Sequence, residues 1–168
     1  MDRLYAPWRD CYMRGHKPCD KKCCIFCAVF LDAVASAEKF VLYRGKDLAI
    51  MLNLYPYNGG HVVIFPFNHV SQLYDLAQEV QNNLMQASCK SMKILKNVLK
   101  CDALNFGANI EKDGGAGIPG HVHLHVVPRW QGDTGFLPII NDTKSVSVDL
   151  NTTFKLLKPE FDKIFQNK

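Results

Sequence analysis

Alternation of polar and hydrophobic residues is clearest within residues 120–130, where single branched apolar residues separate His121, His123 and His125. Because side chains of a β-strand point alternately to opposite faces, this pattern predicts a strand with three imidazoles on one face and an apolar core face. Imidazole is a nucleophile and a metal ligand near neutral pH, so the row suits metal ligation, phosphate chemistry or both. A lone histidine would indicate only a half-exposed strand.

Short apolar runs bounded by turn residues predict four more strands. They cover residues 40–43, 49–55, 61–65 and 102–109. Glycine-containing turns join the first three runs, which therefore predict an antiparallel meander. With the histidine strand, the pattern predicts five strands.

Helical periodicity is strongest in the middle of the chain, where apolar residues at 76, 80, 84, 87, 94 and 98 follow a 3.6-residue period. The pattern predicts one long amphipathic helix, at about 76–99, that packs on the sheet. Asp75 and Gln78 have the spacing of a capping box, which we expect to begin this helix.

The apolar pattern of the C-terminal tail, at about 145–168, predicts a second helix at about 149–166. Pro159 interrupts this pattern. Residues 28–38 show no alternation and predict a short helix or an irregular segment. The sequence shows no repeat and no clear second domain, so we expect one domain over residues 1–168.

Composition narrows the class of protein. The chain is 48% apolar and 21% charged, which is typical of a soluble globular protein, and no apolar run is long enough for a spanning helix. The N-terminus does not resemble a signal peptide, so we expect a cytoplasmic protein without a membrane partner. The net charge of +4, spread along the chain, suits an anionic small ligand and does not require nucleic acid.

Five of the seven cysteines lie in the first 27 residues. Without an export signal they favour thiols or metal ligands over disulfides. Cys24 and Cys27 form a C-x-x-C pair, whose spacing lets two thiolates bind one tetrahedral zinc ion. A redox role is less favoured because no βαβ pattern surrounds the pair. Cys19 and Cys23 are competing ligands.

A glycine-rich loop, residues 113–120, leads directly into the histidine strand. Its four glycines allow backbone N–H groups to approach an anion without obstruction by Cβ atoms. The loop is also compatible with a plain hairpin connection. Its position before three histidines favours phosphate.

Two blocks of the sequence resemble the histidine triad (HIT) family. Residues 121–127, His-Val-His-Leu-His-Val-Val, resemble the triad motif, and residues 53–69 resemble the second block of the family. Residues 116–121 and 128–136 resemble the bacterial branch that includes diadenosine tetraphosphate phosphorylase-like proteins. The resemblance implies an α+β fold with a five-stranded antiparallel sheet and one long packed helix, dimerised so that two sheets continue into one. It also implies nucleotidyl hydrolase or transferase activity on an α-phosphate.

The resemblance assigns roles by position. His123 would attack the α-phosphorus and form a nucleotidyl-imidazole intermediate, and His125 would donate a hydrogen bond to the phosphate or the leaving oxygen. His61 would orient the imidazoles from behind. Asn53 would contact the ribose hydroxyls, and Asn109 would be the amide on the phosphate side.

One departure from the family lies in the glycine-rich loop. Many members carry Gln-Ser or Gln-Thr where this chain has residues 116–118, so a hydroxyl group to the phosphate is missing. We expect backbone N–H groups of Gly115, Ala116 and Gly117 to replace it, which leaves the leaving-group preference open.

For family members with a C-x-x-C pair, the resemblance implies a zinc set of two cysteines and two histidines. Here that set is Cys24, Cys27, His69 and His121, with Cys24 and Cys27 in a cysteine-rich segment at about 11–27. Four such ligands make a closed tetrahedral site, and therefore a structural zinc rather than a catalytic one.

The substrate implied by the resemblance is a dinucleoside polyphosphate or a related adenine nucleotide. Water, phosphate or an amine-linked substrate would make the chain a hydrolase, a phosphorylase or a nucleoside phosphoramidase. A non-catalytic nucleotide-binding module on the same fold is the rival hypothesis. Trp130 and Phe136 could each stack on the base or pack in the core.

Overall fold

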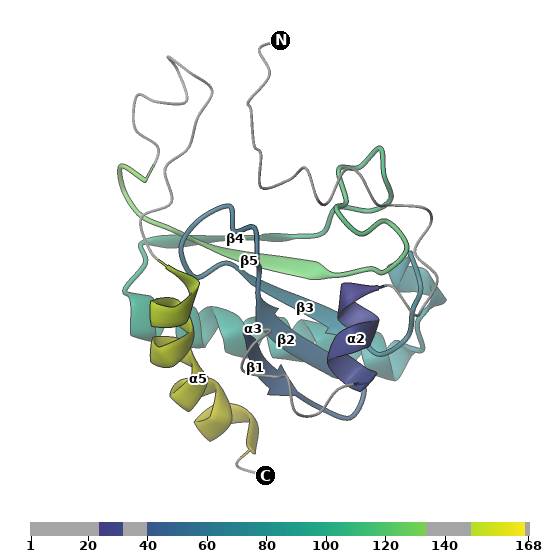
Figure 1. Ribbon diagram of the computed structural model, residues 1–168, viewed down its shortest axis with the longest axis horizontal. Helices are drawn as coiled ribbons and strands as arrows, with labels where there is room; N and C mark the ends of the chain where they lie inside the picture. The colour runs from purple at the N-terminus through teal and green to yellow at the C-terminus, as the bar shows by residue number, and fades with distance from the viewer. Residues whose placement is uncertain (1–23, 32–39, 134–148, 167–168) are drawn as a thin grey trace.

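One antiparallel sheet of five strands organises the part of the chain that the computed structural model describes, residues 24–31, 40–133 and 149–166. The strands lie in the order β1-β2-β3-β5-β4 (Figure 1). Their bounds are Val41–Arg44 for β1, Leu48–Leu52 for β2, Val62–Pro66 for β3, Ala103–Gly107 for β4 and Leu124–Arg129 for β5. The predicted α+β fold with a five-stranded antiparallel sheet is confirmed. Dimerisation through a continuous sheet stays a prediction.

The two faces of the sheet carry separate cores. Helices α3 (Gln78–Leu99) and α5 (Leu150–Gln166) cover one face and bury the larger hydrophobic cluster. The short helix α2 (Ile25–Leu31) lies over the other face with a smaller cluster around Phe26 and Phe65 (Figure 1). Alternate residues of β1, β2 and β3 therefore belong to different cores, as the period of two requires.

The pairing of β3 with β5 fixes where the histidines lie. Val63 lies opposite His125, and Ile64 lies opposite Leu124. Val122, Leu124 and Val126 belong to the larger core, so the imidazoles face the side of α2. The predicted division of the two faces is thus observed.

The histidine strand is shorter than predicted. β5 begins at Leu124, so His121 and His123 precede it. β3 ends at Pro66, beyond which the backbone N–H of Val122 donates to the carbonyl of Val70 at 2.7 Å. The ladder ends here because the segment opposite His121 is no longer a strand.

The capping-box prediction for α3 is wrong. A short 3₁₀-helix, η2 (Leu73–Asp75), and an extended Leu76 separate Asp75 from the helix, whose N-cap is Ala77 without a side-chain cap. The helix therefore begins two residues later than the apolar pattern predicted. Its C-terminal end at Leu99 agrees with the prediction.

Helix α5 continues through Pro159, which was expected to interrupt it. Asp149 accepts hydrogen bonds from the first turn, and Leu157 and Phe161, on either side of the proline, are fully buried. Packing on both sides holds the helix together across the missing N–H. Within the described ranges, no helix has the length and apolar character needed to cross a membrane.

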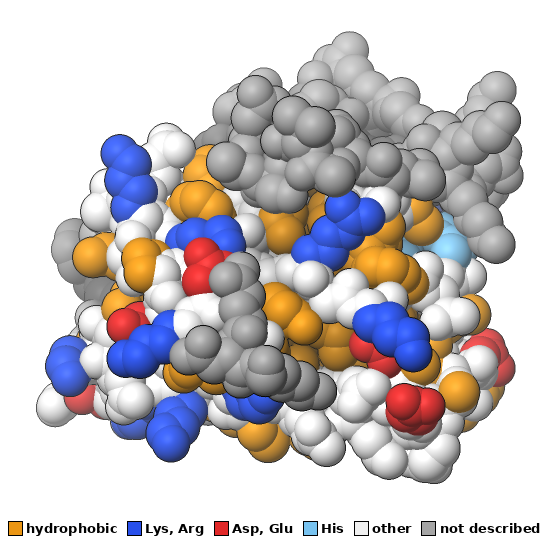
Figure 2. Space-filling view, turned by 90° about the horizontal axis from the view of Figure 1, so that it is seen from below, with side chains coloured by type: hydrophobic (Ala, Val, Ile, Leu, Met, Phe, Trp, Pro, Cys, Tyr) orange, Lys and Arg blue, Asp and Glu red, His pale blue; other side chains and the backbone are white. Residues whose placement is uncertain are grey.

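Charged side chains of the described residues are dispersed over the face shown in Figure 2. Figure 2 shows one face on which Lys and Arg side chains are scattered among hydrophobic and uncharged ones. This distribution agrees with the spread of lysines along the sequence.

The turn before β3 has no room for a side chain at Gly60. Gly60 and Gly132 both have a φ of +77°, but a Cβ at Gly60 would lie 2.3 Å from Cδ1 of Leu99, whereas one at Gly132 would meet nothing within 4 Å. Gly132→Ala should cost about 1–2 kcal/mol of stability from backbone strain alone. Gly60→Ala should cost a further ~1–3 kcal/mol from overpacking.

Urea unfolding of the two variants measures this difference. Gly60→Ala should cost less stability in a Leu99→Ala background than in the wild type, because the clashing methyl group is then absent; a double-mutant cycle separates this effect from the loss of packing that Leu99→Ala itself causes. Equal destabilisation by Gly60→Ala and Gly132→Ala would contradict the packing constraint.

Candidate functional site

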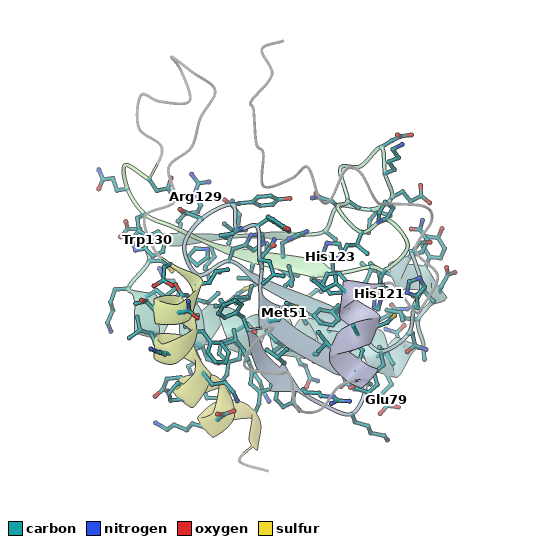
Figure 3. All side chains as sticks on the ribbon, viewed as in Figure 1. Met51, Glu79, His121, His123, Arg129 and Trp130 are labelled. Carbon is teal, nitrogen blue, oxygen red and sulfur yellow. The ribbon has the colours of Figure 1, made fainter. Side chains whose placement is uncertain are left out.

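Five of the six histidines converge on the face of the sheet that α2 covers. His61 precedes β3 and His69 follows it, while the other three lie before and within β5. Figure 3 shows His121 and His123 beside α2. The predicted meeting of these histidines through adjacent strands is observed.

Hydrogen bonds fix the proton positions of His61 and His125. The Nδ1 of His61 faces two donors, the backbone N–H of Tyr57 at 3.1 Å and the side-chain amide of Asn53 at 3.3 Å. Nδ1 must therefore accept, and the proton of His61 lies on Nε2. That Nε2–H donates to Nδ1 of His125 at 2.9 Å. The proton of His125 consequently lies on its own Nε2.

The Nε2–H of His125 is a buried donor without a hydrogen-bond partner among the described residues. Such a group is costly in a folded protein and indicates a ligand acceptor. Burial and the neighbouring His125 and His123 lower the pKa of His61 to about 3. Burial and His123 lower the pKa of His125 to about 4. Both rings are therefore neutral at pH 7, as the hydrogen bonds require.

His123 has the opposite arrangement of proton and lone pair. Its Nδ1 lies 2.9 Å from the backbone carbonyl of His121, which can only accept, so the proton lies on Nδ1. Burial lowers the pKa of His123. Its Nε2 thus carries a lone pair on a neutral ring, which packs against Phe26 with ring centroids 4.9 Å apart. This is the state in which an imidazole can attack phosphorus.

The predicted ligand-contacting asparagines lie close to the same turn. The Oδ1 of Asn53 accepts from the backbone N–H of Tyr55 at 3.0 Å, and its Nδ2 faces His61. The Nδ2 of Asn109 donates to the hydroxyl of Tyr57 at 3.3 Å. Tyr57, in the turn between β2 and β3, connects these groups and was missed by the sequence analysis. Residues in turns follow no hydrophobic period that could have singled it out.

The glycine-rich loop uses some of its donors internally. The backbone N–H of Gly115 donates to the carbonyl of Lys112, and that of Ala116 donates to the carbonyl of Glu111, both at 3.0 Å. In this conformation, two of the three N–H groups expected to bind phosphate close the turn instead. Of the three predicted donors, Gly117 is outside these turn bonds.

A second cluster lies at the other end of the histidine row. The ligand atoms of Cys24, Cys27, His69 and His121 all lie within 4.8 Å of one another. The Nε2 of His121 donates to the carbonyl of Pro66 at 2.9 Å, which leaves Nδ1 facing the thiols. The four donors that the sequence nominated are therefore brought together. Cys19, Cys23 and Phe136 lie outside the described residues.

The spacing of this cluster fits a tetrahedral metal ion. Sγ to Nδ1 distances are 3.4 Å for Cys24 with His121, and 3.2 and 3.6 Å for Cys27 with His69 and His121. Bonds of about 2.3 Å to sulfur and 2.0–2.1 Å to nitrogen at tetrahedral angles give roughly 3.6 Å. Two thiolates and two imidazoles are also the donors that zinc favours. The residues present thus fit a metal ion.

An ionic clamp holds the far end of β5. Arg129 makes two hydrogen bonds to the carboxylate of Asp133, at 2.6 and 2.8 Å. Asp133 also accepts from the backbone N–H of Trp130 and from the buried amide of Asn58, at 3.2 and 2.8 Å. Figure 3 shows Arg129 and Trp130 at the opposite end of β5 from His121. The clamp, absent from the sequence predictions, anchors the turn that carries Tyr57.

The fold and the histidine site together define a class. An antiparallel sheet that carries three alternating histidines, with a fourth from the neighbouring strand behind them, is the arrangement of histidine triad proteins. The chain belongs to this family: the HIT domain matches residues 34–132. The predicted family is confirmed.

Similar proteins are known by sequence and by structure. A protein named AP-4-A phosphorylase from Mycobacterium tuberculosis is 38% identical over 131 residues, covering 78% of this chain and 67% of the relative. A Zn-bound histidine triad family protein from Mycobacterium smegmatis has a similar structure, with a TM-score of 0.69 and 23% identity, covering 89% of this chain and 100% of the other. The Plasmodium falciparum diadenosine triphosphate hydrolase in complex with Cyclomarin A has a TM-score of 0.55 at 22% identity, covering 76% and 80%.

Because His61 is buried and neutral, we expect it to make the free energy of unfolding depend on pH in the acid range. The unfolded chain binds a proton at His61 near its ordinary pKa of 6.5, whereas the folded protein excludes that proton until about pH 3. The contribution of His61 is thus complete above about pH 6.5 and is lost as the pH falls toward the folded-state pKa. In His61→Gln, the free energy of unfolding should decrease about 1.4 kcal/mol less per pH unit than in the wild type between about pH 5 and 6.

Urea unfolding at several pH values, with equal metal content in both proteins, measures these two slopes. The comparison uses slopes because the substitution also changes stability at neutral pH. Identical slopes would show that His61 is not a buried neutral imidazole.

Proposed function

We propose that the chain is a nucleotidyl hydrolase or transferase that cleaves a dinucleoside polyphosphate or a related adenine nucleotide at the α-phosphate. The observation that carries this proposal is the complementary state of two neighbouring rings. His123 has a lone pair on Nε2, and His125, whose ring centroid lies 4.8 Å away, has an unpartnered N–H on Nε2. A nucleophile and a hydrogen-bond donor therefore lie side by side. The relative named AP-4-A phosphorylase supports the substrate class.

The reaction takes two displacements at phosphorus. The Nε2 of His123 attacks the α-phosphorus, a P–N bond forms, and the P–O bond to the leaving group breaks with its electron pair on oxygen. The Nε2–H of His125 stabilises the charge on that oxygen. A water molecule or a phosphate ion then attacks the same phosphorus, and the P–N bond breaks with its electron pair on Nε2, which regenerates His123. When water attacks, its proton is released to the solvent. His61 keeps the proton of His125 in place through its own hydrogen bond.

Binding groups surround this reaction centre in the proposal. Asn53 contacts the ribose hydroxyls, and Asn109 and the backbone of Gly117 contact phosphate oxygens. The amide of Asn53 also donates a hydrogen bond to His61, and the amide of Asn109 also donates one to Tyr57. Each of these two residues therefore helps to position a neighbouring side chain of the site as well as contacting the substrate. Gly115 and Ala116 support the loop through their turn bonds in this conformation.

Removal of the nucleophile should separate binding from turnover. His123→Asn should lower turnover of diadenosine tetraphosphate by at least about 1,000-fold, because the P–N intermediate no longer forms. Nucleotide affinity should remain measurable by calorimetry. Product analysis with and without phosphate distinguishes a phosphorylase, which makes ADP and ATP, from a hydrolase, which makes AMP and ATP.

An adenylate phosphoramidate in the same assay tests the phosphoramidase alternative. Nucleotide binding without turnover of any of these substrates would instead support a non-catalytic binding module. Unchanged turnover in His123→Asn would reject the assigned nucleophile.

We also propose that Cys24, Cys27, His69 and His121 hold a structural zinc ion. Four protein donors leave no open position for substrate or water, which supports a structural role. When bound, the ion would connect α2 to the end of β3 and to the residues that precede β5. Because His121 also accepts the Nδ1–H of His123 through its carbonyl, the ion would stabilise the residue that orients the nucleophile.

Metal analysis tests this centre with a matched pair of cysteines. The purified protein should contain about one zinc per chain. Cys27→Ser should lose it and unfold at a temperature about 5–15 °C lower. Cys89→Ser, which changes an exposed cysteine on α3, should retain both the metal and the stability. Equal zinc content in the two variants would contradict the ligand set.

A further inference from the structure

Tyr57 contacts three of the groups that the proposed reaction needs. Its ring lies against His125, with centroids 5.7 Å apart and planes 27° from parallel, and its centroid is 4.7 Å from that of His61. Its hydroxyl accepts from the amide of Asn109 at 3.3 Å. Its backbone N–H donates to Nδ1 of His61. One residue of a turn thus holds the hydrogen-bonded histidine pair and a proposed phosphate ligand.

The turn holds Tyr57 in a defined position. The next residue, Asn58, is buried, and its amide donates to the carbonyl of Pro128 and to the carboxylate of Asp133, at 2.9 and 2.8 Å. The ionic clamp at the end of β5 therefore fixes the backbone from which Tyr57 projects. The side chain of Tyr57 is 46% exposed, so it lies between the buried histidine pair and solvent.

We propose, on the basis of the proposed function, that Tyr57 is a positioning residue for the departure of the leaving group. Its ring shields the hydrogen bond from His61 to His125, and its hydroxyl holds Asn109 at the phosphate side. The Nε2–H of His125 is thereby directed at the oxygen that leaves phosphorus.

Shielding matters because the histidine pair is a chain of hydrogen bonds in a region of low dielectric. Water admitted beside His125 would offer its Nδ1 another donor and would let the ring turn. β4 leaves space on this face, since the residue opposite His125 is Gly107, where a Cβ would meet nothing within 4 Å. Among the described residues, the aromatic ring of Tyr57 is therefore a main barrier between solvent and the pair of His61 and His125.

This role predicts an effect that depends on the leaving group. A hydrogen bond to the leaving oxygen contributes more when that oxygen is more basic. Loss of the Tyr57 ring should therefore slow a substrate with a basic leaving group more than one with a weakly basic leaving group. A tyrosine that only supports the fold would lower both rates equally.

The kinetic test compares the 4-nitrophenyl and phenyl esters of AMP. In Tyr57→Leu, kcat/KM should fall about tenfold more for the phenyl ester than for the nitrophenyl ester. In Tyr57→Phe the ring remains, so the ratio of the two rates should match the wild type. The decrease in kcat/KM caused by Tyr57→Phe should not add to that caused by Asn109→Ala, because both variants remove the same hydrogen bond, from the amide of Asn109 to the hydroxyl of Tyr57. Tyr74→Phe, at a highly exposed tyrosine, should change nothing.

A second measurement does not depend on turnover. The ¹⁵N NMR signals of the histidine rings report the proton position and the pKa of His125, which faces His61, His123 and Tyr57. In Tyr57→Leu the pKa of His125 should rise by about one unit, because water reaches the ring, while Tyr57→Phe should leave it unchanged.

The two measurements distinguish the possible failures. Absence of any nucleotide turnover in the wild type would refute the proposed function, and NMR would still decide the positioning of His125. Equal loss on both esters, or an unchanged His125 pKa in Tyr57→Leu, would overturn the role of Tyr57 and leave the nucleophile of the proposed reaction unaffected.

Discussion

The antiparallel pairing of β3 with β5 determines where the histidines of the site lie. With Val63 opposite His125, the start of β3 brings His61 to His125, and its end brings Pro66 close to His121. One short ladder therefore positions both the histidine pair and part of the proposed metal site. A slip of one residue would turn the imidazoles toward α3 and the larger core, where they would find no partners.

Backbone and side-chain hydrogen-bond partners give three chemically identical rings different donor and acceptor positions. His121 donates from Nε2 to Pro66, so its Nδ1 faces the thiols. His123 donates from Nδ1 to the carbonyl of His121, so its Nε2 has a lone pair. His125 accepts at Nδ1 from His61, so its Nε2 is a donor. The three arrangements follow from which ring nitrogen already makes a hydrogen bond within the protein. Burial keeps the rings of His61, His123 and His125 neutral.

The sequence predicted those parts of the structure that follow a period or a motif. Alternation around His123 identified the histidine face, and the C-x-x-C pair identified half of the cysteine–histidine cluster. The start of α3 was misplaced because the 3₁₀-helix at Leu73–Asp75 has no periodic signal. Tyr57 and the partners of Asp133 were missed because their contacts join turns that are distant in sequence, and a turn residue has no assigned face before the sheet is built. The turn bonds of Gly115 and Ala116 were not foreseen, because glycine content indicates freedom of the backbone and not where its N–H groups point; their binding of phosphate stays a prediction.

The proposed reaction depends on a covalent bond between Nε2 of His123 and phosphorus. The direct measurement mixes the protein with diadenosine tetraphosphate and adds alkali during the first turnover, which stops the reaction and preserves a P–N bond. Peptide mass spectrometry then locates the nucleotidyl group. We expect an adenylyl group on His123. A nucleotidyl group on another residue, or none while turnover proceeds, would contradict it.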